Sequence, residues 1–340
     1  MITLKKFGIY GNKEVLLFTL KNTAGAFVEL TNYGAAIVSV MAPNRDGELE
    51  PLVLGFDELQ GYLDDKCYIG STIGRFANRI GNAAFELDGK QYNLEANDNT
   101  NSNHGGNSGY NLRVFDYKIE DDRLLFTLNS PDGDGGFPGN LGLTVSYQWT
   151  EKNQLKITYL AETDQPTIAN FTNHAYFNLS GKEGSMLNHQ LTIYADKVLE
   201  TDKEYIPTGK VIPAGKSAFL GNRISDKIKE NNGEGFNHYY ILNNQDDNVS
   251  LAAVLDDENS GRRLNVYTTY PGLMFYTGDF LESIHPGHWG RPYKPFDSLC
   301  LECQFYPDAP NHSTFPSVVL KPGEQYREEI IYEFTLIPDN

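Results

Sequence analysis

The chain has 340 residues, of which 40% are hydrophobic and 21% are charged, and this composition is typical of a globular protein with a substantial core. Its 45 acidic and 28 basic side chains give a formal net charge of -17, which repels phosphate backbones and anionic lipid. Nucleic acid and membrane surfaces are therefore not expected as partners. The sequence also offers neither the ~20 continuous apolar residues of a membrane span nor a signal peptide, so we expect a cytoplasmic protein.

The first half of the chain alternates short regular patterns with turns. Residues 56–60 have a spacing typical of one or two helical turns. Residues 84–94 are predicted to form a hairpin, because their central Asp-Gly pair suits a tight type I′ turn. The loops 97–110 and 130–140 are rich in Asn, Asp and Gly, and such loops are expected to form rims where binding groups collect.

Residues 168–177 are predicted to form a strand with two different faces. The period of two sends His174 and Tyr176 to one polar face and apolar residues such as Phe171 and Phe177 to the other. A histidine displayed on a rigid strand is a candidate general acid or base. The same pattern also fits an ordinary amphipathic strand.

Residues 298–305 show the same alternation. Its apolar face includes Cys303 and Phe305, whereas Glu302 and Gln304 are expected to point outward together. Glu302 is therefore a candidate carboxylate partner for a catalytic group on another strand.

The remaining patterns complete an all-β prediction. A second hairpin is predicted over 147–159, a short helix over 224–228, and a last strand pair from 318–320 with 330–334. With no repeat and no low-complexity linker, residues 1–340 are expected to form a single domain, a large antiparallel β-sandwich with few short helices.

The three cysteines do not indicate a metal or a disulfide. Cys67, Cys300 and Cys303 are an odd count without the density of a secreted disulfide scaffold, so they are expected to be reduced. Cys300 and Cys303 have the spacing of a zinc pair, but residues three apart on a strand point to opposite faces. A metal held by His104, His174 and Glu302 has suitable chemistry and remains an alternative.

A series of short motifs runs along nearly the whole chain. They are Val53-Leu54-Gly55-Phe56, Ile73-Gly74-Arg75-Phe76-Ala77-Asn78-Arg79-Ile80, Asn103-His104-Gly105-Gly106, Ser130-Pro131-Asp132-Gly133, Thr172-Asn173-His174-Ala175-Tyr176-Phe177-Asn178-Leu179, Tyr276-Thr277-Gly278, and Leu301-Glu302 with Tyr306-Pro307-Asp308-Ala309. In their joint order and spacing these motifs resemble the aldose 1-epimerases, or galactose mutarotases. That family has a large antiparallel β-sandwich with an open sugar-binding cleft.

The resemblance implies a reaction. Such an isomerase interconverts the α and β anomers of a free aldose, such as galactose or glucose, through the open-chain aldehyde. By analogy, Glu302 removes the proton from the anomeric hydroxyl and His174 protonates the ring oxygen, while His104 contacts the sugar near the ring oxygen. No cofactor and no metal are implied, because only protons move.

The resemblance also implies a set of sugar-binding residues. Asn78 and Arg79 are expected to bind hydroxyls, and Tyr176 is expected to donate a hydrogen bond or to wall the cleft. Arg75 is expected to be structural. Residues Asn237 and Met274 are also expected to contact the substrate, although they depart from the family pattern.

These two departures concern recognition of the sugar. The family usually carries an aspartate where this chain has Asn237, and a glutamine is known in relatives where it has Met274. An amide supplies no charge, so charge-assisted bonds are lost at that position. The preferred aldose is therefore left open, as is the choice between a monomer and a homodimer.

Other functions fit parts of the sequence. A non-catalytic carbohydrate-binding or sugar-sensing protein on the same fold would explain the two departures and the abundant aromatic residues. A glycosidase needs two carboxylates, and the sequence nominates Glu302 alone. An epimerase of phosphorylated sugars would need local Arg or Lys clusters in a strongly acidic chain.

Overall fold

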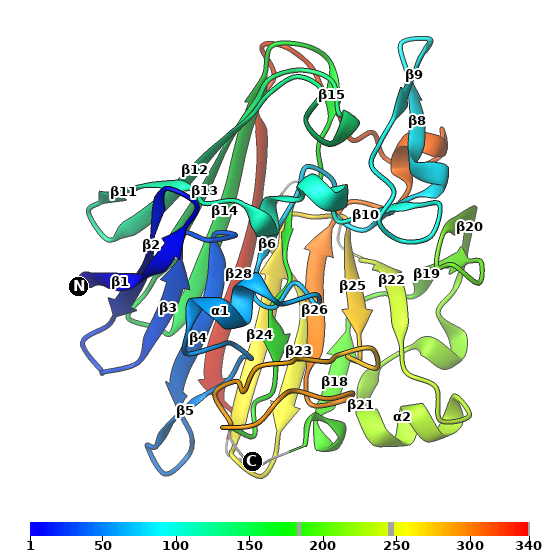
Figure 1. The fold of residues 1–340 in the computed structure, drawn as a ribbon. Helices are drawn as coiled ribbons and strands as arrows, with labels where there is room; N and C mark the ends of the chain where they lie inside the picture. The colour runs from blue at the N-terminus through cyan, green and yellow to red at the C-terminus, as the bar shows by residue number, and fades with distance from the viewer. Residues whose placement is uncertain (182–184, 244–247, 339–340) are drawn as a thin grey trace.

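The computed structural model describes residues 1–181, 185–243 and 248–338, and it consists mainly of antiparallel strands in two layers (Figure 1). The back layer is a nine-stranded sheet, which in spatial order contains β11 (Asp116–Glu120), β12 (Arg123–Ser130), β13 (Leu141–Trp149), β14 (Gln154–Thr163), β28 (Tyr326–Leu336), β24 (Arg262–Thr268), β23 (Ser250–Asp257), β18 (Gln190–Ile193) and β21 (Leu220–Arg223).

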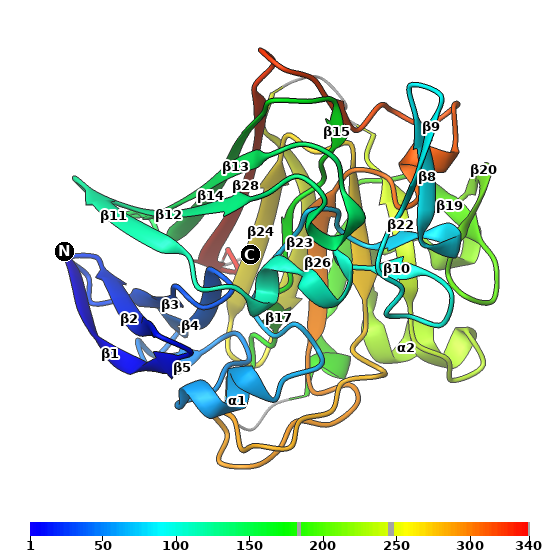
Figure 2. The same cartoon turned by 45° about the horizontal axis from the view of Figure 1, so that its top comes forward.

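The front layer combines two sheets. The five-stranded sheet contains β1 (Ile2–Tyr10), β2 (Lys13–Lys21), β3 (Phe27–Thr31), β4 (Ala36–Pro43) and β5 (Leu49–Pro51). The six-stranded sheet contains β17 (Tyr176–Phe177), β26 (Leu299–Gln304), β25 (Gly272–Tyr276), β22 (Asn237–Ile241), β19 (Lys197–Thr201) and β20 (Pro207–Pro213). A β-bridge between Val53 and Phe177 joins the two sheets, so that one front layer covers the back sheet (Figure 2).

Short strand pairs, two α-helices and several 3-10 turns connect these sheets. The pairs are β6 (Thr72–Ile73) with β16 (Thr172–Asn173), β7 (Arg79–Ile80) with β10 (Ser102–Asn103), β8 (Ala84–Leu87) with β9 (Lys90–Asn93), and β15 (Thr167–Ile168) with β27 (Val319–Leu320). The helices are α1 (Leu59–Leu63) and α2 (Ile224–Glu230). No helix in the described residues has the length and apolar character needed to cross a bilayer.

The prediction of an all-β sandwich is confirmed, as are the two hairpins with local turns. Asp88 and Gly89 both have positive φ, as a type I′ turn requires. The pairing of 318–320 with 330–334 is wrong, because β27 pairs with β15 whereas β28 pairs with β14 and β24.

The predicted strand over 168–177 is also wrong in its extent. This segment makes only the three two-residue strands β15, β16 and β17, each of which pairs with a different partner. All of its residues are buried, so it has no solvent-facing side. The segment instead runs through the interior and links the two layers.

The main core lies between the two layers. Residues of β26 that face the back sheet, such as Leu301 and Cys303, share a hydrophobic cluster with Leu264 and Val266 of β24. Cys300, Glu302 and Gln304 point to the opposite side of β26, as predicted, but every residue of this strand is buried. Loops cross the outer face of the six-stranded sheet (Figure 1), and β26 is therefore buried on this face as well.

Arg75 ties the loop 130–140 to the core. Its side chain is buried, and its guanidinium donates hydrogen bonds to the carbonyl oxygens of Pro138 (2.7 Å) and Gly139 (2.9 Å). It also donates to the hydroxyl oxygen of Ser130 (2.7 Å). The guanidinium satisfies carbonyl groups that would otherwise lack partners, which agrees with the structural role expected for Arg75.

We expect the Arg75→Met variant to lose about 3 kcal/mol of unfolding free energy, because the substitution leaves several buried carbonyl oxygens without donors. Urea denaturation of both proteins measures this loss. The exposed Arg123 on β12 provides a matched control, and Arg123→Met is expected to change stability by less than about 0.5 kcal/mol. Equal effects of the two substitutions would contradict the structural role of Arg75.

Candidate active site

A pocket of about 290 Å³ opens on the outer face of the six-stranded sheet. It is lined by all eight residues that the sequence nominated for catalysis or binding, and by eight more. The nominated residues are Asn78, Arg79, His104, His174, Tyr176, Asn237, Met274 and Glu302. The others are Lys66, Cys67, Tyr68, Asn97, Asp98, Asn103, Tyr276 and Phe280.

The floor of the pocket follows from strand register. Met274 on β25 pairs directly with Glu302 on β26, and Asn237 on β22 pairs with Tyr276 on β25. Directly paired residues of antiparallel strands lie on the same face of a sheet. Three strands therefore present their side chains to one pocket, although their positions in the sequence are far apart.

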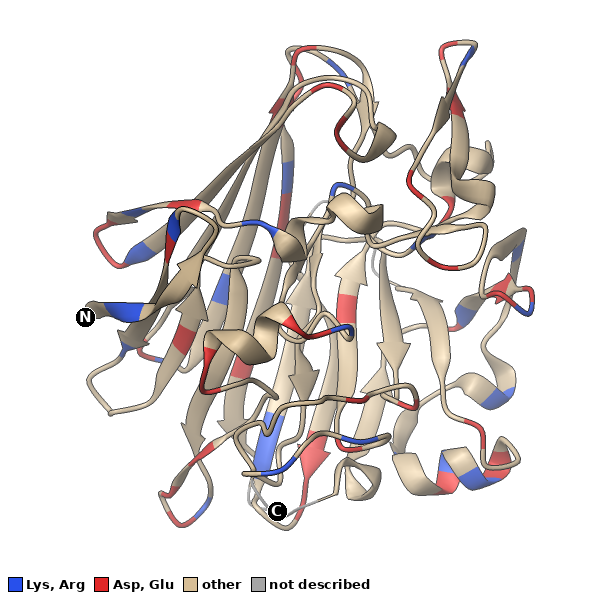
Figure 3. Ribbon diagram, in the orientation of Figure 1, with Lys and Arg blue, Asp and Glu red and all other residues tan. Residues whose placement is uncertain are grey.

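Glu302 is the one acidic residue of β26. Figure 3 shows that the strands around the centre of the front layer are mostly tan, so charged residues are sparse there. Its side chain is buried, and its Oε2 atom has no hydrogen-bond partner among the described residues. Burial raises the pKa of Glu302 to about 8, against an opposing effect of the Arg79 cation. A buried carboxyl with an unused oxygen indicates a group kept for a ligand.

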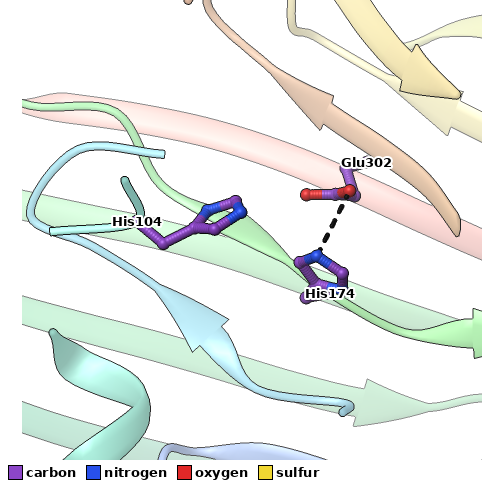
Figure 4. A group of neighbouring side chains, drawn as sticks. All are labelled: His104, His174 and Glu302. Atoms are coloured by element: carbon purple, nitrogen blue, oxygen red, sulfur yellow. Dashed lines mark ion pairs between the residues drawn. The ribbon is translucent and has the colours of Figure 1, made fainter. Parts of the chain in front are cut away.

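His174 approaches Glu302 from the segment between β16 and β17. Figure 4 shows the two side chains facing each other. The distance from Nε2 of His174 to Oε1 of Glu302 is 3.6 Å, and both side chains are almost completely buried. The backbone of His174 is fixed on both sides, because its N–H donates to Ser71 and its carbonyl accepts from Gly70. Burial lowers the pKa of His174 to about 4, so that the ring is neutral in the free protein at neutral pH.

His104 reaches the same point from the loop that follows β10. Its Nδ1 accepts a hydrogen bond from the backbone N–H of Asn78 (3.2 Å), and its own N–H donates to the Asn78 carbonyl (3.1 Å). The neutral ring therefore carries its hydrogen on Nε2. Burial, with smaller effects of His174 and Arg79, holds the pKa of His104 well below its usual value.

The glycine after His104 allows this loop to pass close to the chain. Gly105 has a φ of +87°, and a Cβ atom there would lie 2.1 Å from the carbonyl oxygen of Gly74. Only glycine fits this conformation and this contact. The sequence His104-Gly105 thus couples a candidate catalytic side chain to the turn that aims it.

The remaining polar wall is built around an ion pair. Nε of Arg79 lies 2.7 Å from Oδ2 of Asp98, and the guanidinium also lies 5.3 Å from the centre of the Tyr205 ring. The backbone N–H of Arg79 donates a hydrogen bond to Oδ1 of Asn78 (2.8 Å). This wall holds fixed hydrogen-bond donors and acceptors, which suit the hydroxyl groups of a polar ligand.

Sequence reasoning missed the segment around Lys66, Cys67 and Tyr68. Asp65 holds this segment by accepting the backbone N–H groups of Cys67 (2.9 Å) and Ile69 (2.7 Å). The Tyr68 ring lies 4.7 Å from that of His104, measured between centroids. The segment has no alternation, and no local signal indicates that the fold lays it across the pocket.

Two other groups of lining residues had partial signals. Asn97, Asp98 and Asn103 lie in the loop 97–110, which was expected to form a binding rim. Tyr276 belongs to a motif of the family resemblance, whereas exposed Phe280 had no signal at all.

The ligand-capable atoms of His104, His174 and Glu302 all lie within 4.8 Å of one another. Zinc ligands at 2.0–2.1 Å in a tetrahedron lie only about 3.4 Å apart, so this cluster would have to contract around a metal. The hydrogen on Nε2 of His104 would also have to leave that nitrogen. These three side chains therefore fit a metal poorly. They better suit proton transfer by His174 and Glu302, with the Nε2–H group of His104 as an additional hydrogen-bond donor.

Comparison with known proteins identifies the family. Residues 16–333 match the family model described as aldose 1-epimerase. The chain belongs to the aldose 1-epimerase family. The Escherichia coli (strain K12) protein named aldose 1-epimerase is 38% identical over 333 residues, covering 94% of each chain. The Homo sapiens protein named galactose mutarotase is 38% identical over 317 residues, covering 91% of each.

Solved structures agree with this assignment. An aldose epimerase homologue from C. elegans has a TM-score of 0.89 and 30% identity, covering 95% of this chain and 99% of that one. Galactose 1-epimerase from Lactobacillus acidophilus has a TM-score of 0.85 and 28% identity, covering 99% of both chains. The family is one of isomerases, so the alternative of a non-catalytic sugar-binding protein is not favoured.

We expect this epimerase family member to keep its activity after dialysis against a metal chelator, because its donor cluster is arranged for protons. Polarimetry before and after dialysis with EDTA tests this. A loss of activity that Zn²⁺ or Mn²⁺ restores would contradict the expectation and would favour the metal alternative.

Proposed function

We propose that this enzyme interconverts the anomers of a free aldose, with Glu302 as the base and His174 as the acid. The observation that carries the proposal is the 3.6 Å separation of Nε2 of His174 and Oε1 of Glu302 in a buried pocket. The anomeric oxygen and the ring oxygen of a pyranose are bonded to the same carbon. A base and an acid this close together suit two such neighbouring oxygens.

The proposed reaction transfers two protons in each direction. The Glu302 carboxylate takes the proton of the anomeric hydroxyl while the His174 imidazolium gives its Nε2 proton to the ring oxygen. The bond between the anomeric carbon and the ring oxygen breaks, and the aldehyde forms. After rotation about the bond between the first two carbons, the protons return and the ring closes on the other face of the carbonyl.

The proton inventory of the pair fits this cycle. Between pH values of about 4 and 8 the two groups together hold one proton, which lies on Glu302 in the free protein. Bound sugar must stabilise the arrangement with carboxylate and imidazolium. Ring opening then returns the pair to its neutral form, which a buried site favours.

Other pocket residues have supporting roles in the proposal. The Nε2–H group of His104 donates to the sugar close to the ring oxygen, and Asn78 and Arg79 bind hydroxyl groups. Tyr176 packs beside His174, with the two ring centroids 5.1 Å apart. These groups hold the sugar while the two protons move.

Met274 and Asn237 are proposed to meet the carbon next to the anomeric centre. The strands β26, β25 and β22 are neighbours in this order, so Glu302, Met274 and Asn237 follow one another across the floor of the pocket. His174 lies on the β17 side of Glu302. We place the second carbon on the side of the anomeric centre that faces Met274, because Met274 pairs directly with Glu302 across β25 and β26. Neither side chain carries a charge, so the substituent on that carbon is recognised by a neutral amide and an apolar surface.

The rival functions have less support in the pocket. A glycosidase needs a second free carboxyl, whereas the other carboxylate lining the pocket, Asp98, is paired with Arg79. A phosphorylated sugar needs cations to bind its phosphate group. Of the two cations that line the pocket, Arg79 is paired with Asp98, which leaves Lys66. We further propose that the enzyme works in the cytoplasm, which its three free cysteines support, and that it is a monomer or a homodimer.

Polarimetry of freshly dissolved α-glucose, α-galactose, xylose, arabinose and maltose tests the activity. We expect relaxation faster than buffer for at least one of these sugars. The Glu302→Gln and His174→Asn variants are each expected to lose about 10²- to 10⁴-fold in kcat. Glu282→Gln, an exposed carboxylate outside the pocket, serves as the control and is expected to match the unmodified enzyme.

The pH dependence of kcat/KM is expected to be bell-shaped. Below a pH of about 4 the pair takes up a second proton and Glu302 can no longer act as a base. Above a pH of about 8 the pair loses its one proton and His174 can no longer act as an acid. Initial rates across this range measure both limbs, and a profile without a basic limb would contradict the pairing of these roles.

A further inference from the structure

A cysteine lies on the far side of the His174 ring from Glu302. Cys300 precedes Glu302 by two residues on β26 and therefore lies on the same face of the strand. Its Sγ atom is 3.6 Å from Nδ1 of His174, and the residue is completely buried. The mechanism proposed above gives this contact no role.

The two nitrogens of the His174 ring thus meet two side chains from one strand. Nε2 faces Oε1 of Glu302, and Nδ1 faces Sγ of Cys300. The other described contacts of the ring are aromatic, with Tyr68, His104 and Tyr176. Cys300 is therefore the side chain that can set the hydrogen on Nδ1.

The chemistry of this sulfur is that of a neutral thiol. Burial raises the pKa of Cys300 well above its usual value, and the negative charge of Glu302 acts in the same direction. A hydrogen bond from the side chain of Tyr176, which pairs with Cys300 across β17 and β26, opposes this effect. A thiol sulfur keeps lone pairs that can accept hydrogen bonds.

We infer that Cys300 is a positioning residue that accepts the Nδ1–H group of His174. With the hydrogen on Nδ1 held in this way, Nε2 becomes the one ring nitrogen that gains and loses a proton during the reaction. The role resembles that of a carboxylate that fixes the tautomer of a catalytic histidine, with a weaker acceptor. Its kinetic consequence rests on the proposed function of His174.

A valine at position 300 removes the lone pairs and keeps a similar apolar volume, whereas a serine keeps an acceptor oxygen. Cys303 provides a matched control, because it is equally buried on the same strand but faces the core between the two layers. The test therefore compares Cys300→Val, Cys300→Ser and Cys303→Val in the full chain. If Cys300→Val does not fold, Cys300→Ala replaces it.

We expect Cys300→Val to lower kcat about tenfold with KM within about twofold, since the sugar is still bound but the acid is misprotonated. Cys300→Ser is expected to recover most of this loss, and Cys303→Val is expected to leave kcat unchanged. The acid limb of the pH profile in Cys300→Val should move down by about half a pH unit, because the imidazolium that forms across this limb loses an acceptor. An unchanged kcat in Cys300→Val, or an equal loss in Cys303→Val, would overturn the inference.

A second measurement does not depend on activity. The ¹⁵N chemical shifts of the His174 ring report which nitrogen carries the hydrogen, and the assignment can be made with His174→Asn. We expect the Nδ1–H tautomer in the unmodified protein and a shift toward Nε2–H in Cys300→Val. The same tautomer in both proteins overturns the role of Cys300, whereas absence of mutarotation with the expected tautomers overturns the proposed function alone.

Discussion

The contact between the imidazole of His174 and the carboxyl group of Glu302 is the constraint around which the pocket is arranged. Burial removes both groups from water and favours their neutral forms. At neutral pH the two groups therefore hold one proton in total. One group can then give a proton to a ligand while the other takes one, so the total number of protons on the pair stays the same. In the proposed mechanism the same two groups therefore exchange protons with the sugar in both ring opening and ring closure.

The surrounding fold explains why this contact can exist so deep in the protein. β26 is buried on both faces, with the core of the sandwich on one side and the pocket on the other. The strand gives Glu302 a fixed backbone, while His174 arrives on a connection between the layers. These two segments and the loop that carries His104 therefore converge, and each is held in place by backbone hydrogen bonds.

Local patterns in the sequence predicted those features that neighbouring residues determine, such as turns and the two faces of a strand. The Asp88-Gly89 turn was predictable because two adjacent residues determine its geometry. The alternation along β26 correctly separated Glu302 from the core, but it could not reveal that loops cover the outer face. The pairing of 318–320 failed because strand partners are chosen by the whole sheet, and no nearby signal identifies β15 as the partner.

The candidate site shows the same division. His174 and Glu302 were nominated first from strand alternation and the other residues through the family resemblance, and all of them line one pocket. Tyr68 and Phe280 were missed, because their contribution depends on where loops cross in space. The link between Cys300 and His174 was missed for a similar reason, since an alternation pattern shows a shared face but not a neighbour 126 positions away.

The double burial of β26 also bears on how such a protein can diversify. A substitution on one side of this strand is expected to disturb the core, and a substitution on the other side to disturb the groups proposed to transfer protons. A change of sugar preference is therefore expected to need substitutions on the neighbouring strands β25 and β22 or in the rim loops, which also line the pocket. Substitutions on β26 are therefore expected to be tolerated less well than substitutions on the neighbouring strands or on the rim loops.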